Sequence, residues 1–313
     1  MKKILVIGSS NTDLIAQVNS FPKAGETLKG ISFSQAMGGK GANQALAAHK
    51  LGGDVKFITC LGNDANGQNS IEYYKEMNLD ISSSLIVDDA SSGTAVITVD
   101  NTGENSIVII PGANDRLSPE YVNEIENEIT DSDIVVLQME IPYESIKVAC
   151  ELAFKYKKII MLNVAPACKL DSELMRMIDI LVVNETEAET ISGKKIEVEG
   201  KEAVIEELLS MGARTVILTL GKGGCLLKDA ATEIAMDAFI VDALDTTAAG
   251  DTFCGALAAR LSKGENWKKS LKFASAAAAI CVTRMGAQPS VPSETEVLDF
   301  MEKQFANSNN HSA

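Results

Sequence analysis

Short apolar runs alternate with longer segments of helical periodicity over most of this 313-residue chain. The runs are apolar throughout, which is typical of strands that are covered on both faces. The predicted strands are residues 4–7, 55–60, 134–137, 159–162, 180–183 and 216–220, and the predicted helices are residues 41–51, 67–77, 118–129, 143–156 and 200–211. These repeated β-α units predict a three-layer α-β-α sandwich around a mostly parallel central sheet.

Two segments break this alternation and predict a small β-sheet. Residues 13–36 have short β-like stretches and no helical pattern, and residues 93–110 have two apolar runs around Asn101-Thr102-Gly103, which is a hairpin signature. We expect these two insertions to form a lid on a single α/β domain that spans residues 1–313. The polar residues 307–313 are expected to form a disordered tail.

Polar or glycine-rich segments follow several predicted strands directly. They are residues 8–13, 138–140, 163, 184–187 and 221–224. In open α/β sheets the carboxyl ends of the strands meet at one edge, and ligands bind there. We therefore expect these segments to converge on one binding site.

Composition narrows the possible partners. The formal net charge of −15 disfavours a broad basic surface that binds nucleic acid. The negative charge of a small phosphorylated ligand therefore has to be neutralised by groups within its own binding site. No apolar stretch approaches the ~20 residues of a membrane span, and no signal-peptide pattern precedes the first strand. The six cysteines form no C-x-x-C pair, and two histidines are too few for a histidine-based triad or metal site. We expect a cytoplasmic protein with reduced thiols that binds neither nucleic acid nor membranes.

The segment Asp245-Thr246-Thr247-Ala248-Ala249-Gly250-Asp251 leads into an Ala-rich helix. Small residues at a helix start leave backbone N–H groups open to an anion, and Asp251 would lie beside them as a potential base. The alternative is an N-capping aspartate before an ordinary helix. The residue pattern of this segment alone leaves both interpretations open.

A glycine-rich segment, Gly38-Gly39-Lys40-Gly41-Ala42-Asn43-Gln44, leads into another predicted helix. It matches neither a phosphate-binding P-loop nor a dinucleotide fingerprint, since no Ser or Thr follows the lysine and the glycine spacing differs. It is either a tight strand–helix turn or a polar rim that binds a hydroxylated ligand.

The remaining candidate segments each have a plain and a functional interpretation. Asn11 and Asp13 form an Asx-turn or bind vicinal hydroxyls, and Glu140 is a surface carboxylate or a ligand-binding one. Residues 184–187 are the first turn of a helix or hold a hydrated Mg²⁺. Residues 219–224 are a hairpin turn or a loop beneath a nucleotide.

Together these motifs resemble those of the ribokinase-like sugar kinases, also called the phosphofructokinase-B-type family. The resemblance runs from residue 4 to about residue 291, with the motifs in the family's order. GGKGANQ at 38–44 and DTTAAGDTF at 245–253 are its most specific parts, and VTRMGAQPSV at 282–291 is similar to the family's ion-binding run. The resemblance implies a kinase domain with a β lid and a homodimer formed through paired lids.

The resemblance also implies a role for each motif residue. Asp251 is the implied general base, and the N–H groups of Ala248, Ala249 and Gly250 are the implied anion hole. The implied sugar-binding residues are Asn11, Thr12, Asp13, Gly39, Lys40, Gly41, Ala42, Asn43, Glu140 and Asp251. The implied ATP-binding residues are Asn184, Glu187, Thr219, Leu220, Gly221, Lys222, Gly223, Gly224, Gly250 and Ser275. The implied K⁺-site residues are Asp245, Thr247, Cys281, Arg284, Gly286 and Ser290.

The implied reaction is ATP-dependent phosphorylation of D-ribose at O5, which gives D-ribose 5-phosphate and ADP, with Mg²⁺ at the nucleotide phosphates and K⁺ as an activator. One alternative is a kinase of the same family that acts on deoxyribose, a nucleoside or another sugar. Another is a sugar- or nucleotide-binding regulator without catalysis. Ser275 departs from the family, whose members often have Asn or His near the adenine.

Overall fold

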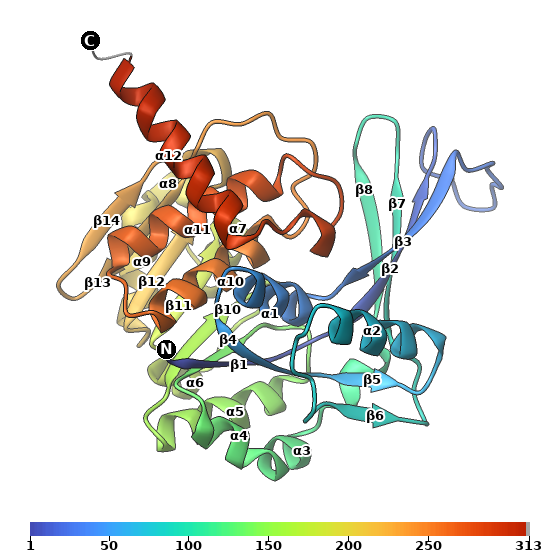
Figure 1. Cartoon of the computed structure of the whole chain (residues 1–313), viewed down its shortest axis with the longest axis horizontal. Coiled ribbons are helices and arrows are strands. Elements are labelled where there is room, and N and C mark those ends of the chain that lie inside the picture. Colours follow the sequence, from blue (N-terminus) through green and yellow to red (C-terminus); the bar gives the residue numbers. More distant parts are fainter. Residues whose placement is uncertain (311–313) are drawn as a thin grey trace.

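An eight-stranded sheet runs through the centre of the structure, a computed structural model that describes residues 1–310 (Figure 1). Its strand order is β14-β13-β12-β11-β10-β9-β1-β4. The strands from β12 to β4 in this order are parallel, and β13 and β14 continue the sheet in antiparallel pairing. Their bounds are β1 Lys3–Ile7, β4 Asp54–Ile58, β9 Ile134–Leu137, β10 Ile159–Asn163, β11 Ile180–Asn184, β12 Thr215–Thr219, β13 Cys225–Asp229 and β14 Glu233–Met236.

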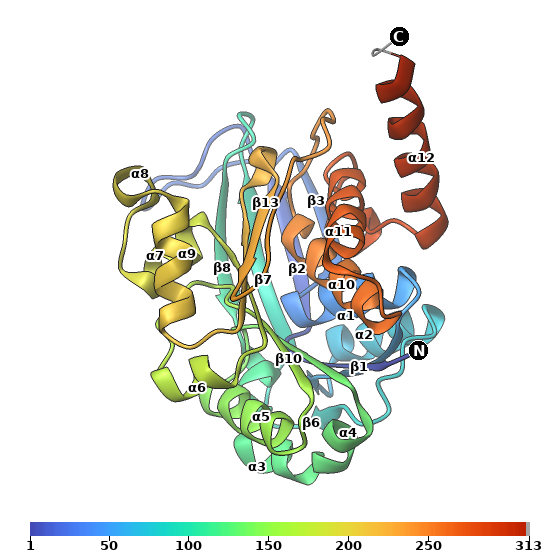
Figure 2. The ribbon, with the colours of Figure 1, turned by 90° about the vertical axis from the view of Figure 1, so that its left-hand side faces the viewer.

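Helices cover both faces of this sheet (Figures 1 and 2). Alternate residues of β1 enter different cores, Ile4 and Val6 on one face and Leu5 and Ile7 on the other. The first core is covered by α1 Lys40–Lys50, α2 Ala65–Glu76, α10 Ala249–Ser262, α11 Trp267–Cys281 and α12 Glu294–Asn310. The second is covered by α3 Pro119–Glu124, α4 Glu126–Asp131, α5 Tyr143–Lys155, α6 Ser172–Met177, α7 Glu185–Ser192, α8 Ile196–Glu199 and α9 Lys201–Ser210. The predicted three-layer sandwich with a mostly parallel sheet is confirmed.

Helices α1 and α10 approach each other closely because Gly255 has no side chain. A Cβ at Gly255 would lie 2.6 Å from both the Gln44 carbonyl oxygen and the Ala47 Cβ, which is closer than real Cβ contacts allow. The contact brings the helices that follow the motifs at 38–44 and 245–251 side by side, although these motifs are about 200 residues apart in the sequence.

Several element boundaries differ from the predictions. The predicted helix 118–129 is divided into α3 and α4 at Ile125. The apolar run 55–60 ends as a strand at Ile58, and β5 (Cys60–Gly62) pairs with β6 (Leu85–Val87) in a separate two-stranded sheet. Helix α12 extends to Asn310, so residues 307–310 of the expected disordered tail are helical, and residues 311–313 lie outside the described residues.

A separate four-stranded sheet stands beside the sandwich, at the right of Figure 1, and forms the expected lid. Its strand order is β3-β2-β7-β8, and β7 and β8 form the predicted hairpin. The first lid segment is two residues longer at each end than the predicted 13–36, since β2 begins at Asn11 and β3 ends at Gly38, and the second has the predicted bounds 93–110. The bounds are β2 Asn11–Gln17, β3 Ser32–Gly38, β7 Gly93–Val99 and β8 Asn105–Ile110.

The expectations from composition were reduced thiols and no membrane span. All six cysteines lie within residues 1–310 and are free thiols, and five of them are buried. Among the described residues, no helix combines the length and the apolar composition that crossing a membrane requires.

Candidate active site

Asp251 lies in the first turn of α10 and is only 7% exposed. Both carboxylate oxygens accept hydrogen bonds from α1: Asn43 Nδ2 donates to Oδ2 at 2.9 Å, and Gln44 Nε2 donates to Oδ1 at 3.0 Å. No side chain caps α10, so the interpretation of this segment as an aspartate N-cap is wrong. A buried carboxylate that neutral amides hold in place is available for chemistry at the helix start.

The backbone before Asp251 opens the helix end. Ala248, the residue that precedes α10, has φ 58° and ψ 12°, a left-handed conformation that is uncommon for alanine. The Ala249 N–H donates to the Thr246 carbonyl oxygen at 3.3 Å, so one of the three expected anion-hole donors is partly engaged within the loop. A Cβ at Gly250 would meet no atom within 4 Å, and the space in front of this residue is therefore free for an anion.

Several charged groups surround Asp251 on the side of the lid. The Glu140 Oε2 atom accepts hydrogen bonds from Ser9 Oγ at 2.6 Å and from the Lys40 backbone N–H at 3.0 Å, so Glu140 is tied to the glycine-rich segment. The carboxylate of Asp251, followed by those of Glu140 and Glu187, raises the pKa of Lys40 despite its burial. Lys40 therefore stays a cation within a group of carboxylates.

Asp13, on the lid strand β2, is 8% exposed and belongs to the same charged group. Burial, and then the charges of Glu140 and Asp251, raise the pKa of Asp13 to about 7. Nearby, the Asn43 Oδ1 atom is buried and accepts no hydrogen bond from the described residues. Buried polar atoms without a partner are uncommon, and this one can bind a ligand hydroxyl.

The other residues predicted to bind sugar have different positions. Gly39 precedes α1, and Gly41 and Ala42 pack that helix against the connection from β1 to β2: a Cβ at Gly41 would lie 2.5 Å from the Gly8 carbonyl carbon, and the Ala42 N–H donates to the Ser9 carbonyl oxygen at 2.8 Å. They support the site through the backbone.

Asn11 and Thr12 lie next to each other on β2 but have different surroundings. Asn114 Nδ2 donates to Asn11 Oδ1 at 2.8 Å, a contact that the sequence analysis missed. Thr12 lines a separate cavity of about 220 Å³ together with Gln35, Met37 and Tyr73. Because side chains alternate along a strand, Thr12 does not point to the side of Asp13.

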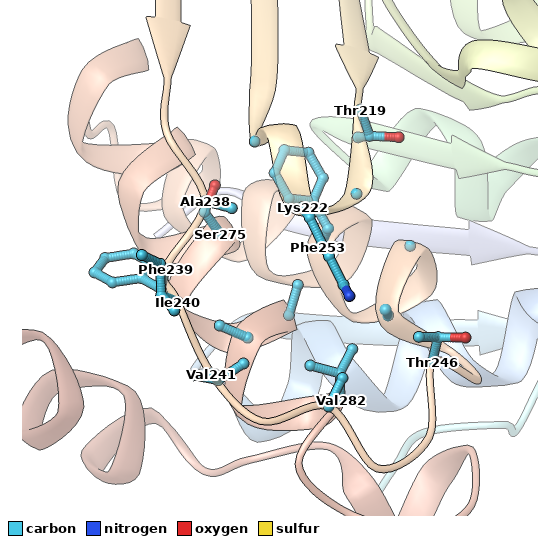
Figure 3. Close-up of a pocket in the computed structure, with 17 residues that line it drawn as sticks. Thr219, Lys222, Ala238, Phe239, Ile240, Val241, Thr246, Phe253, Ser275 and Val282 are labelled. Carbon is cyan, nitrogen blue, oxygen red and sulfur yellow. The ribbon is translucent and has the colours of Figure 1, made fainter.

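A larger cleft of about 500 Å³ reaches the start of α10 from the other side (Figure 3). Of the residues predicted to bind ATP, those that line it are Thr219, Gly221, Lys222, Gly224, Gly250 and Ser275. Ala249, predicted for the anion hole, also lines it, and the sequence analysis missed the other wall residues, which are Ala238, Phe239, Ile240, Val241, Ala243, Thr246, Phe253, Ala278, Ala279 and Val282. The cleft therefore joins an apolar chamber to the backbone N–H groups beside Asp251.

Four residues predicted to bind ATP do not line this cleft: Asn184, Glu187, Leu220 and Gly223. Asn184 and Glu187 form a capping box at the start of α7, in which the Glu187 N–H donates to Asn184 Oδ1 at 2.9 Å and the Asn184 N–H donates to Glu187 Oε2 at 2.8 Å. Burial raises the pKa of Glu187. Within residues 1–310, no group of three or more His, Cys, Asp or Glu side chains is placed to hold a metal ion.

The six residues predicted to surround K⁺ lie around one loop junction. Asp245 Oδ2 accepts a hydrogen bond from the Gly286 N–H at 2.8 Å, and Cys281 Sγ lies 3.6 Å from the Thr247 carbonyl oxygen and 2.9 Å from Ser290 Oγ. The Arg284 side chain instead forms an ion pair with Glu296 at 2.5 Å. The junction thus connects the loop before α10 to the segment after α11.

Comparison with known proteins agrees with this arrangement. The model of the pfkB family of carbohydrate kinases matches residues 1–294. A ribokinase from Haemophilus influenzae is 39% identical over 304 residues, which cover 96% of this chain and 99% of that protein. A deoxyribokinase from Salmonella typhi is 36% identical over 300 residues, which cover 95% and 98%. The structure of Arabidopsis thaliana ribokinase complexed with ribose and ATP has a TM-score of 0.90 and 31% identity, and the match covers 96% of this chain and 98% of that one.

The fold and the site thus define an α/β sugar kinase with a β lid. The chain belongs to the pfkB family of carbohydrate kinases, and it is a phosphotransferase whose curated relatives include several ribokinases.

The raised pKa of Asp13 predicts a pH-dependent cost to folding. Between its ordinary value of 3.8 and about 7, the folded protein holds a proton that the unfolded chain releases, so stability falls as pH rises through this window. Asp13→Asn removes this loss. The free energy of unfolding of the variant, relative to that of the wild type, should be about 2–3 kcal/mol higher at pH 8 than at pH 5, since one pKa unit corresponds to about 1.4 kcal/mol.

Urea denaturation at both pH values measures this difference. Asp115→Asn, at an exposed aspartate, is the matched control and should behave like the wild type at both. A gain for Asp13→Asn that is equal at pH 5 and pH 8 would contradict the assignment.

Proposed function

We propose that the protein transfers the γ-phosphoryl group of ATP to O5 of D-ribose. The observation that supports this most strongly is the position of Asp251. It lies at an open helix N-terminus, with a cluster of hydrogen-bonding and charged groups on one side and the 500 Å³ cleft on the other. Phosphoryl transfer needs two aligned substrates, a proton acceptor and stabilisation of developing negative charge, and these features can supply each of them.

The sugar fits on the side of the lid. The carboxylates of Asp13 and Glu140 accept hydrogen bonds from hydroxyls, and the Asn43 amide offers its free oxygen. Asp251 takes the proton from the attacking hydroxyl, while Asn43 and Gln44 keep its carboxylate directed at that position. The ribokinase relatives and the ribose complex of the Arabidopsis enzyme support ribose as the sugar. The deoxyribokinase relative makes deoxyribose the main alternative.

The nucleotide fits in the cleft. Its apolar walls suit an adenine ring, Ser275 offers one hydroxyl there, and the N–H groups at the start of α10 face the transferred phosphoryl. Mg²⁺, when bound to the nucleotide, neutralises phosphate charge, and the buried Glu187 carboxylate suits it through water ligands. The hydroxyl and carbonyl oxygens at the junction of Asp245 and Ser290 suit a K⁺ ion that stiffens the anion-hole loop.

We also propose that the protein is a cytoplasmic homodimer that pairs through its lid. The free thiols suit a reducing compartment. Strands β3 and β8 expose Phe33, Ile107, Val108 and Ile109, each by at least 46%. Apolar side chains exposed on the edge strands of a sheet indicate a surface that another molecule covers. Sedimentation at micromolar concentration should give the mass of a dimer, and Val108→Asp should give a monomer; a monomeric wild type would contradict the proposal.

A coupled assay of ADP release over a panel of sugars tests the reaction. With Mg²⁺-ATP, kcat/KM should be highest for D-ribose among ribose, 2-deoxyribose, fructose and adenosine, and Na⁺ in place of K⁺ should lower it. Highest activity with 2-deoxyribose would favour a deoxyribokinase, and no ADP release with any sugar would favour a sugar- or nucleotide-binding regulator without catalysis. Equal rates in K⁺ and Na⁺ would refute the cation site.

Asp251→Asn tests the role of the base. The variant keeps the shape and burial of the side chain but cannot accept the proton, so kcat should fall by about 10²–10⁴. Ribose binding, measured by calorimetry, should change much less, because most of the sugar contacts lie on other residues. Turnover close to the wild-type rate would show that another group accepts the proton.

A further inference from the structure

A network of buried side-chain amides is hydrogen-bonded to Asp251. Gln44, on α1, is fully buried, and its Nε2 atom donates to Asp251 Oδ1 and to Asn163 Oδ1, each at 3.0 Å. Its Oε1 atom accepts a hydrogen bond from Gln138 Nε2 at 2.8 Å. Asn163 Nδ2 in turn donates to the Val182 carbonyl oxygen at 3.1 Å. The Gln44 side chain is thus bonded at both of its amide ends.

This bonding fixes the orientation of the Gln44 amide. If the amide flipped, its oxygen would face the carboxylate of Asp251 and its nitrogen would face the Gln138 amino group, so three favourable hydrogen bonds would become repulsive contacts. Gln138 follows β9 and Asn163 ends β10, and both are therefore anchored at the edge of the central sheet. Hydrogen bonds through Gln44 thereby connect the Asp251 carboxylate to the central sheet.

We infer that Gln44 is a positioning residue for the general base and that Gln138 acts on the base only through Gln44. This inference rests on the proposed function. Gln44 holds Asp251 Oδ1, which leaves Oδ2, shared with Asn43, directed at the substrate hydroxyl. A base misplaced by about 1 Å can lower the rate about 100-fold, so a rigid donor behind it has a large kinetic effect.

A buried glutamine that only filled space would have a different pattern of contacts. An apolar side chain of similar length fills volume without the cost of burying polar atoms, whereas here every polar atom of the Gln44 amide has a partner. Its two hydrogen-bond partners, Gln138 and Asn163, form no hydrogen bond with Asp251 among the described residues. Gln44 is therefore the residue through which this amide network contacts the base.

Gln44→Met tests this role, because methionine keeps the length and volume of the side chain and removes all three of its hydrogen bonds. We expect kcat to fall about 10- to 100-fold while KM for sugar and for ATP changes less than about threefold. The acidic limb of the kcat–pH profile should move to higher pH, because a carboxylate that loses a donor holds its proton more tightly. The charged or titratable groups around Asp251 are Lys40, Asp13, Glu140, Glu187, Cys254 and Cys281, and none of them is changed.

A double-mutant cycle separates positioning from general packing. Gln138→Met alone should lower kcat less than Gln44→Met, and the double variant should be no slower than Gln44→Met, because the effect of Gln138 passes through Gln44. Gln68→Met, a surface glutamine on α2, is the matched control and should keep the wild-type rate. If Gln44→Met does not fold, as judged by circular dichroism, Gln138→Met serves as the test. The acidic limb of its kcat–pH profile should move in the same direction but by less.

Two results overturn the inference. One is a folded Gln44→Met with the wild-type kcat and pH profile, and the other is an additive loss in the double variant. ADP release by the wild type is measured in the same experiment with each sugar of the panel. No ADP release from the wild type would refute the proposed function, whereas an active wild type with an unaffected Gln44→Met refutes only the positioning role.

Discussion

The contact between the starts of α1 and α10 is the constraint on which the site depends. A carboxylate as deeply buried as Asp251 is costly unless donors replace the lost water, and the donors here come from Asn43 and Gln44 on α1. They reach it because Gly255 lets the two helices approach closely. One helix packing therefore closes a hydrophobic core and also holds the carboxylate at the open helix end.

The central sheet could be predicted because strands covered on both faces are apolar along their whole length. Local patterns carried less information where a boundary depends on distant partners. Asn11 looked like the beginning of a loop, yet it starts β2 because it pairs with Gly38 and Gly93. The break at Ile125 lies within a continuous helical pattern, so periodicity alone did not reveal it.

The polar part of the site could be predicted from the order of strands and loops, since parallel strands bring their carboxyl ends together. The walls of the cleft could not, because Phe239, Val241 and Ala279 look like ordinary core residues in a sequence. Thr12 was assigned to the sugar along with its neighbours, and only the alternation of side chains on an established strand separates it from Asp13. Long-range geometry is what the sequence lacked in both cases.

Strand β2 places a charged residue of the lid among charged residues of the body. Asp13 belongs to the lid sheet, while Glu140 and Asp251 belong to the body. A ligand that bridges these groups has a different affinity for each orientation of the lid, and it shifts their populations by that difference. Under the proposed function, part of the binding energy of the sugar closes the lid, so a molecule that forms no hydrogen bond with Asp13 leaves the lid more open and water at the reacting groups.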